Sequence, residues 1–153
     1  KMTAEGAETV INGNLKSAFL CVIAALPIMR EQKDGVLIHT SSWAGRFVGL
    51  MSGAAYLSAK HAVVAMSHSI NMEECVHGIR SSVFCPAEVA TPIMEKRPRP
   101  PTKEERAQML QPADCGDLIR YIACMPAHVC MNEVLLNPTW NRSYIAMKRG
   151  QSR

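Results

Sequence analysis

Short apolar runs alternate with long helical patterns along this chain of 153 residues, and few folds accommodate that order. Three short, mainly apolar runs have the length of buried strands: residues 36–40, 79–85 and 133–136. Apolar residues recur at helical spacing around them, over residues 3–31, 54–77 and 113–124. Strands that alternate with helices run parallel in one sheet. The sequence therefore predicts a parallel α/β fold.

A sheet of three strands is small, because parallel sheets are covered on both faces and protected at both edges. No sequence before the helical pattern at 3–31 supplies another strand, and the chain opens with Lys1 rather than Met. We therefore expect residues 1–153 to form a single, partial domain, the carboxyl-terminal part of a larger one. The strand at 36–40 is then expected to have an unpaired edge and an uncovered apolar face, which predicts association or poor solubility of the chain alone.

The positive charge of the chain is concentrated at its carboxyl end. The net charge is +4, and residues 134–153 contain four basic residues and no acid, so the remaining chain is neutral. A nucleic-acid-binding protein has a basic face on its folded body, often interleaved with aromatic side chains, whereas aromatic residues are 5% of this chain. We therefore expect no nucleic-acid partner, and we interpret residues 141–153 as a solvated basic tail.

The sequence predicts neither a membrane segment nor a metal site. The longest unbroken apolar run, residues 18–29, is shorter than the roughly 20 residues that a membrane-spanning helix needs, and no signal-peptide pattern is present. The six cysteines form no CxxC pair, and no Cys and His residues have the spacing of zinc ligands. We expect reduced thiols in a cytoplasmic protein.

The stretch from the first predicted strand into the next helix carries the residues best suited to chemistry. Tyr56 and Lys60 are four residues apart at the start of a helical pattern, so they share one helix face. A positive ammonium beside a phenol favours the phenolate, which makes Tyr56 suitable as a proton donor and acceptor near neutral pH. Ser42 follows the strand at 36–40, at the end where ligands bind in open α/β sheets, and its hydroxyl can hold a carbonyl oxygen.

Taken alone, a Tyr–Lys pair at this spacing is common on helix surfaces and usually has no catalytic role. The motifs around the pair change that interpretation. Residues 41–45 (Ser-Ser-Trp-Ala-Gly) and 56–60 (Tyr-Leu-Ser-Ala-Lys) follow the pattern Ser-Ser-x-Ala-Gly, then Tyr-x-x-x-Lys. After a strand, this pattern resembles the short-chain dehydrogenase/reductase family.

The resemblance extends in order over residues 3–140. Residues 14–19 (Asn-Leu-Lys-Ser-Ala-Phe), 78–80 (Gly-Ile-Arg) and 85–91 (Cys-Pro-Ala-Glu-Val-Ala-Thr) are similar to the family's helix, strand and turn motifs. Residues 126–138 are similar to the closing segment of one cytosolic branch. The resemblance implies part of a Rossmann-like, doubly wound parallel sheet, namely its carboxyl-terminal strands and helices.

The resemblance also implies an NAD(P)-dependent oxidoreductase that interconverts a small-molecule alcohol and a carbonyl compound by hydride transfer. Tyr56 would exchange a proton with the substrate oxygen, and Lys60 would stabilise the phenolate and bind the nicotinamide ribose hydroxyls. Ser42 would position the substrate oxygen, and Asn14 would interrupt its helix and hold a water of the proton relay. The cofactor, NADP or NAD, would contact Tyr56 as well as Lys60, and the residues Pro86, Ala87, Val89 and Thr91. The proline-rich residues 92–112 would form a substrate lid.

Several departures from the family pattern bear on function. Ala87 stands where the family usually has Gly, and His39 and Ser81 stand where Asn is common; we interpret His39 as structural. The family's glycine-rich phosphate loop and cofactor selector have no counterpart in this sequence, which leaves NAD and NADP as alternatives. The alternative function is therefore an inactive remnant that acts as an oligomerisation or interaction module. The helical patterns at 3–31 and 54–77 resemble those that pair across family dimers, which predicts a homo-oligomer.

Overall fold

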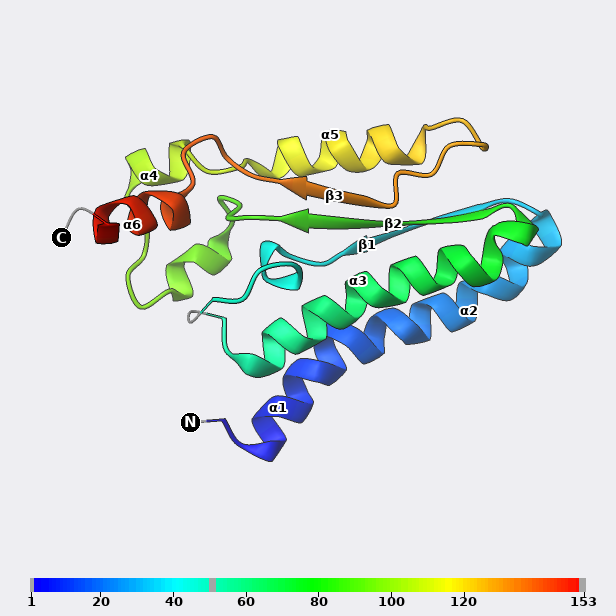
Figure 1. Ribbon diagram of the computed structural model, residues 1–153, viewed down its shortest axis with the longest axis horizontal. Coiled ribbons are helices and arrows are strands. Elements are labelled where there is room, and N and C mark those ends of the chain that lie inside the picture. Colours follow the sequence, from blue (N-terminus) through cyan, green and yellow to red (C-terminus); the bar gives the residue numbers. More distant parts are fainter. Residues whose placement is uncertain (1, 50–51, 152–153) are drawn as a thin grey trace.

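The computed structural model describes residues 2–49 and 52–151, apart from the side chains of residues 149 and 151. Three strands form one parallel sheet in the order β1-β2-β3 (Figure 1). Their bounds are Gly35–Thr40 for β1, Ile79–Pro86 for β2 and Glu133–Leu136 for β3. Each strand begins within one residue of its expected run, and the predicted parallel α/β fold is confirmed.

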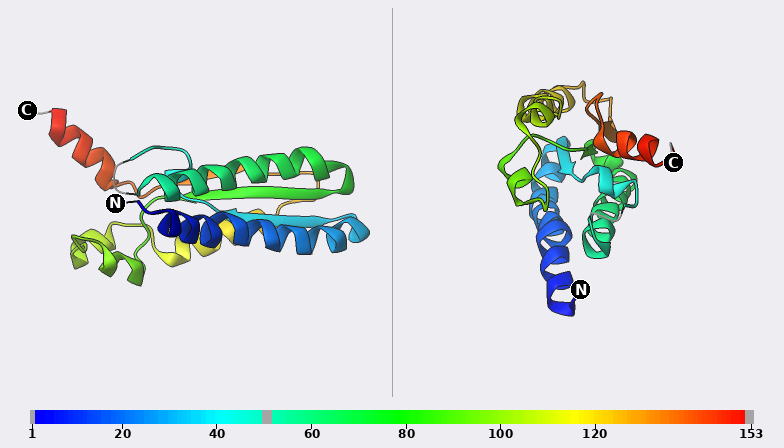
Figure 2. Two further views of the ribbon diagram at one scale, coloured as in Figure 1. Left: turned by 90° about the horizontal axis from the view of Figure 1, so that it is seen from below. Right: turned by 90° about the vertical axis from the view of Figure 1, so that its left-hand side faces the viewer.

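Helices cover both faces of this sheet. α2 (Ser17–Gln32) and α3 (Ala54–Glu74) lie on one face, and α5 (Pro112–Ala123) lies on the other (Figures 1 and 2). The shorter helices are α1 (Ala4–Ile11), α4 (Lys103–Ala107) and α6 (Arg142–Gln151). The helical pattern predicted at 3–31 is divided, because a π-helical turn, Asn12–Lys16, joins α1 to α2.

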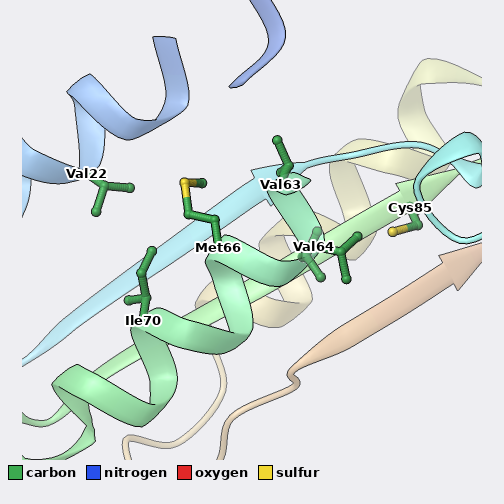
Figure 3. Close-up of a cluster of buried hydrophobic side chains, with 7 residues drawn as sticks. Val22, Val63, Val64, Met66, Ile70 and Cys85 are labelled. Carbon is green, nitrogen blue, oxygen red and sulfur yellow. The ribbon is translucent and has the colours of Figure 1, made fainter. Parts of the chain in front are cut away.

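The apolar core lies between the sheet and the two long helices. Its buried members come from α2, α3 and β2 (Figure 3): Val22, Val63, Val64, Met66, Ile70, Val83 and Cys85. Val63, Met66 and Ile70 recur every three or four residues along α3, and with the adjacent Val64 they form one buried stripe of the helix. Val83 and Cys85 alternate along β2 with Phe84, whose side chain points to the opposite face of the sheet and is also buried. β2 is therefore the central strand, packed on both faces.

Two contacts hold the carboxyl ends of α2 and α3 together. The Arg30 guanidinium donates to both carboxylate oxygens of Glu74, with 2.8 Å between Nε and Oε2, and these hydrogen bonds hold the Glu74 pKa below its usual value. Nearby, Gly78 has a φ of 74°, and a Cβ at this position would collide with the carbonyl oxygen of Lys33. These contacts bring the starts of β1 and β2 side by side.

One edge of the sheet and the outer face of α2 remain uncovered. Within the described residues, β1 pairs only with β2, and Leu20, Ile23 and Ile28 of α2 are each more than half exposed. The chain exposes 10040 Å², whereas a compact protein of its mass exposes about 7,700 Å². The structure therefore has the unpaired edge of β1 that the sequence predicts, whereas the uncovered apolar surface belongs to α2 and not to the strand itself.

One helix is long enough to span a membrane, although no unbroken apolar run in the sequence reaches that length. The continuous helical run Ala4–Gln32 is long and apolar enough to cross a membrane, by length and composition alone, and only 6% of its most apolar stretch is buried. Polar residues such as Asn12 and Lys16 interrupt the helical pattern predicted at 3–31, so the run contains no unbroken apolar stretch of membrane-spanning length. A core helix of a soluble protein or a signal sequence meets the same criterion, so this feature by itself assigns no location.

The carboxyl-terminal segment also departs from expectation, because it is not simply a solvated tail. Residues 142–151 form α6, and Arg142 pairs with Glu88 of the body. Asn141 is buried and caps the helix, since its Oδ1 accepts the N–H of Ser143 at 2.9 Å. The basic composition of this segment predicted solvation, but Arg142 has a carboxylate partner on the body of the protein. Residues 152 and 153 of this segment, and 50 and 51 of the loop before α3, lie outside the described residues.

Candidate active site

Hydrogen bonds tie the carboxyl end of β1 to the first turns of α3. Ser41 is buried, donates its N–H to the backbone of β2 at 2.8 Å, and donates its hydroxyl to the carbonyl oxygen of Lys60 at 2.8 Å. Ser42 caps a 3₁₀ turn, Trp43–Gly45, and its Oγ accepts the N–H of Ala44 at 3.2 Å. The first serine therefore fixes the backbone, and the second places a hydroxyl at the tip of the strand.

Tyr56 and Lys60 lie one turn apart on α3, and both are half-buried. The Lys60 Nζ donates to the carbonyl oxygen of Thr40 at 3.0 Å and lies 5.7 Å from the centre of the Tyr56 ring. Burial lowers the pKa of Lys60 from its usual value. The amine is thus held beside the phenol by the end of the same strand that Ser42 follows.

A close backbone approach keeps the Ser42 turn against α3. Gly45 is buried, and a Cβ at this position would collide with the Ser41 hydroxyl and lie 2.8 Å from the carbonyl oxygen of Lys60. Only glycine permits this contact without displacing backbone. The structure thus packs the turn that follows Ser42 against the part of α3 that carries Lys60, at the carboxyl end of β1, the edge where parallel sheets bind ligands.

Asn14 lies in the π-helical turn between α1 and α2, where the helix is locally widened. Its Nδ2 donates to the carbonyl oxygen of Val10 at 2.9 Å. Together with His39 and Thr40, it lines a hollow of about 330 Å³ beside β1. Asn14 therefore shares this hollow with Thr40, whose carbonyl oxygen binds the Lys60 amine, whereas its own side-chain hydrogen bond is to its helix.

His39 faces this hollow from β1 and is only 9% exposed. Its Nε2 has no hydrogen-bond partner among the described residues, and burial lowers its pKa. The folded protein therefore resists protonation of this imidazole, whereas the unfolded chain accepts the proton near the ordinary pKa of about 6.5. Acid consequently favours the unfolded chain at this position.

We expect the free energy of unfolding to fall as the pH drops below about 6.5, because the unfolded chain then binds a proton that folded His39 refuses. His39→Gln removes the titrating group and should make the loss smaller. Urea unfolding followed by circular dichroism, at neutral pH and at about pH 5.5, measures the difference. The exposed His128 provides the control variant His128→Gln. Equal acid-dependent losses in His39→Gln and the unmodified chain would contradict the prediction.

The residues expected along the cofactor follow β2 at the same edge of the sheet. Pro86 ends β2, Ala87 donates its N–H to the backbone of β3 at 2.9 Å, and Val89 pairs with Leu110 in an isolated parallel bridge. Thr91 precedes a 3₁₀ turn within the segment predicted to form a lid. Ala87 has no positive φ, so it replaces the usual Gly without backbone strain. Among the described residues, no cluster of three or more His, Cys, Asp or Glu is placed to bind a metal ion.

Two groups of side chains near this edge escaped the sequence analysis. The Trp43 ring stacks on Phe47 with ring centres 4.1 Å apart. The ring of Tyr144 in α6 meets the Trp43 ring edge-on, with centres 5.7 Å apart. Arg142 forms a two-pronged ion pair with Glu88. Neither group has a sequence motif, since Tyr144 and Arg142 reach their partners from far along the chain. Aromatic residues are only 5% of the chain, and this low content does not indicate where the aromatic side chains meet.

A family model described as short chain dehydrogenase matches residues 1–101. Among curated proteins, levodione reductase of Leifsonia aquatica is 37% identical over 94 residues, which are 61% of this chain and 34% of that protein. Dehydrogenase/reductase SDR family member 6 of Aquarana catesbeiana is 28% identical over 143 residues, or 86% of this chain and 58% of that protein. This chain therefore spans well under two thirds of the length of either relative.

Solved structures share the fold. A crystal structure of levodione reductase has a TM-score of 0.77 at 25% identity and covers 89% of this chain and 58% of that one. Serine dehydrogenase from Escherichia coli has a TM-score of 0.75 at 25% identity, covering 90% of this chain and 56% of that one. A 3-oxoacyl-[acyl-carrier protein] reductase from Brucella melitensis, described with bound NAD, has a TM-score of 0.75 at 23% identity and covers 89% and 52% of the two chains. With the family model matching residues 1–101, this chain belongs to the short-chain dehydrogenase/reductase family.

Proposed function

We propose that this chain supplies the catalytic residues of an NAD(P)-dependent oxidoreductase that interconverts an alcohol and a carbonyl compound. The observation that carries the proposal is the Lys60 amine, which donates to Thr40 at 3.0 Å and lies 5.7 Å from the centre of the Tyr56 ring. Ser42 presents its hydroxyl at the tip of the strand that ends at Thr40. Two of the similar proteins are named as reductases, which supports this class of reaction.

In the proposed reduction, the Tyr56 hydroxyl gives its proton to the carbonyl oxygen of the substrate. The charged Lys60 stabilises the phenolate that remains. The Ser42 oxygen already accepts the N–H of Ala44, so its hydroxyl proton is available for a hydrogen bond to the substrate oxygen. Asn14 holds a water through which the Tyr56 proton is replaced. Oxidation of the alcohol uses the same groups in reverse, with the phenolate as base.

The donors at this edge fit the nicotinamide end of a dinucleotide. Lys60 uses one N–H on Thr40 and has two further donors for ribose hydroxyls, and the loop 86–91 continues from β2 at the same edge. When bound, the nicotinamide supplies or accepts the hydride. The phosphates of such a cofactor bind a glycine-rich turn at a helix N-terminus, and this sequence contains no such motif. The fit is therefore to the nicotinamide riboside portion.

Cofactor binding and turnover test the proposal directly. The 153-residue chain is titrated with NADH and NADPH and then assayed with dialkyl ketones, aryl ketones and diketones. We expect binding of at least one dinucleotide and its oxidation only when a carbonyl compound is present. A chain that is folded by circular dichroism, yet neither binds nor oxidises either dinucleotide, would overturn the proposal for this chain.

A specific observation favours a second candidate function, an interaction module that forms a homo-oligomer. The chain exposes about 2,400 Å² more than a compact protein of its mass, and Leu20, Ile23 and Ile28 lie on the uncovered face of α2. An obligate interface buries a total of about 2,000–5,000 Å², so this surface suffices for one. The helical residues 3–31 and 54–77 would form this interface.

The cysteines are all free, which supports a reducing compartment such as the cytoplasm.

Ile23→Lys is expected to weaken self-association, because an apolar interface cannot accept an unpaired ammonium without a large desolvation cost. Ile23 is 63% exposed, so the fold of the single chain should be unaffected. Sedimentation velocity should show a shift from oligomer toward monomer. Tyr121→Lys is the control, since Tyr121 is similarly exposed, at 59%, but lies on α5. An unchanged distribution of sedimentation coefficients in Ile23→Lys would show that this face of α2 is not part of the interface.

A further inference from the structure

One arginine joins three segments that surround the carboxyl ends of the strands. The Arg142 guanidinium donates to both oxygens of Glu88, with Nε–Oε2 and Nη2–Oε1 distances of 2.8 and 2.7 Å. Its Nη1 lies 3.7 Å from Oε2 of Glu105. The three side chains are only about one-quarter exposed, so the pairs are partly shielded from water and salt. Two parallel hydrogen bonds from one guanidinium also fix orientation, which a single contact does not.

The two carboxylates belong to the loop and the helix that flank the candidate active site. Glu88 lies in the loop 86–91, and its carbonyl oxygen accepts the N–H of Leu110 at 3.2 Å. Glu105 lies in α4, and its carboxylate also accepts the N–H of Thr102 at 3.0 Å in a capping box. Figure 1 shows α4 and α6 at the end of the sheet to which the strand arrows point. Arg142 therefore links the predicted cofactor loop to α4 of the predicted lid.

The opposite side of α6 contacts the turn that carries Ser42. Residues two apart in a helix point in nearly opposite directions, so Tyr144 projects away from the side that carries Arg142. Its ring meets Trp43 edge-on, with centres 5.7 Å apart. Trp43 directly follows Ser42 and opens the 3₁₀ turn that ends at Gly45. The first turn of α6 is thus placed between the lid helix and the Ser42 turn.

We propose that Arg142 is a positioning residue of the active site, which holds the loop 86–91 and α4 in register with the Ser42 turn through α6. This inference rests on the proposed oxidoreductase function. It assigns Arg142 to substrate binding rather than to the chemical step, because its charged head pairs with protein carboxylates and not with Tyr56 or Lys60. Lysine cannot replace it fully, since an ammonium lacks the planar fork that engages both oxygens of a carboxylate.

Hydrogen exchange tests the positioning role without requiring activity. In Arg142→Gln we expect faster amide exchange in residues 86–91 and 102–110, with little change in β1 and β2. The charge exchange Arg142→Glu with Glu88→Arg should restore slow exchange in residues 86–91. Arg120→Gln is the control, because Arg120 is exposed on α5. Exchange in Arg142→Gln equal to that of the unmodified chain would overturn the proposal.

Kinetics separate positioning from a purely structural contact. Loss of charge-assisted hydrogen bonds in Arg142→Gln should raise KM for the carbonyl substrate about tenfold or more with kcat nearly unchanged. Arg142→Lys should give an intermediate KM. A fall in kcat at constant KM, or identical KM values in all variants, would overturn the assignment. If the unmodified chain shows no turnover, the oxidoreductase proposal fails, and the exchange experiment still decides whether Arg142 holds these segments together.

Discussion

Tyr56→Phe is expected to reduce carbonyl turnover about 10²–10⁴-fold, the range that a positioned proton donor contributes, and to leave the fold intact. The substitution removes the hydroxyl but keeps the ring whose centre lies 5.7 Å from the Lys60 Nζ. Lys60 stays bound to Thr40, because that hydrogen bond involves no atom of Tyr56. The proton route is therefore lost while the packing around it survives, and the effect should fall on kcat.

Steady-state kinetics and thermal unfolding of the purified variant measure the two effects separately. Tyr121→Phe is the matched control, since Tyr121 lies exposed on α5 and loses the same atom. We expect it to behave like the unmodified chain in both measurements. Unchanged turnover in Tyr56→Phe would reject Tyr56 as the proton donor. Loss of turnover together with loss of the cooperative unfolding transition would show a structural role instead.

Gly45→Ala is expected to reduce both stability and turnover, although it adds only one methyl group. The new Cβ would collide with the Ser41 hydroxyl and lie 2.8 Å from the carbonyl oxygen of Lys60. Because that carbonyl belongs to the backbone of α3, either the helix or the turn must shift. Overpacking of this kind costs about 1–3 kcal/mol of unfolding free energy. The same shift changes the position of Ser42 relative to α3. We therefore expect turnover to fall even under conditions in which the variant is fully folded.

Gly49→Ala provides a matched control from the same loop. A Cβ at Gly49 meets nothing within 4 Å among the described residues, and its φ is not positive. We therefore expect nearly unchanged stability and turnover in this variant. Urea unfolding and initial-rate assays on the two alanine variants give the comparison. Equal behaviour of Gly45→Ala and Gly49→Ala would show that the Ser42 turn does not require close contact with α3.

Sequence patterns predicted the strands of this protein and the placement of Tyr56 and Lys60 on one helix, because both are local. A buried strand needs a short apolar run, and the runs at 36–40 and 79–85 lie within β1 and β2. Tyr56 and Lys60 share a helix face because of their four-residue spacing alone. The prediction was weaker for helices interrupted by polar residues. The helical pattern at 3–31 matches the run Ala4–Gln32, but the π-helical turn at Asn12–Lys16 was not predicted.

Only the tertiary structure decided which distant residues support that site. Arg142 pairs with Glu88 across 54 positions of the chain, and Tyr144 reaches Trp43 from a segment that its basic composition marked as solvated. No periodicity encodes such contacts, because they depend on where the strands place their ends and not on neighbouring residues. Local spacing thus determined the pairing of Tyr56 with Lys60, and the parallel sheet, by gathering the ends of its strands at one edge, decided what surrounds that pair.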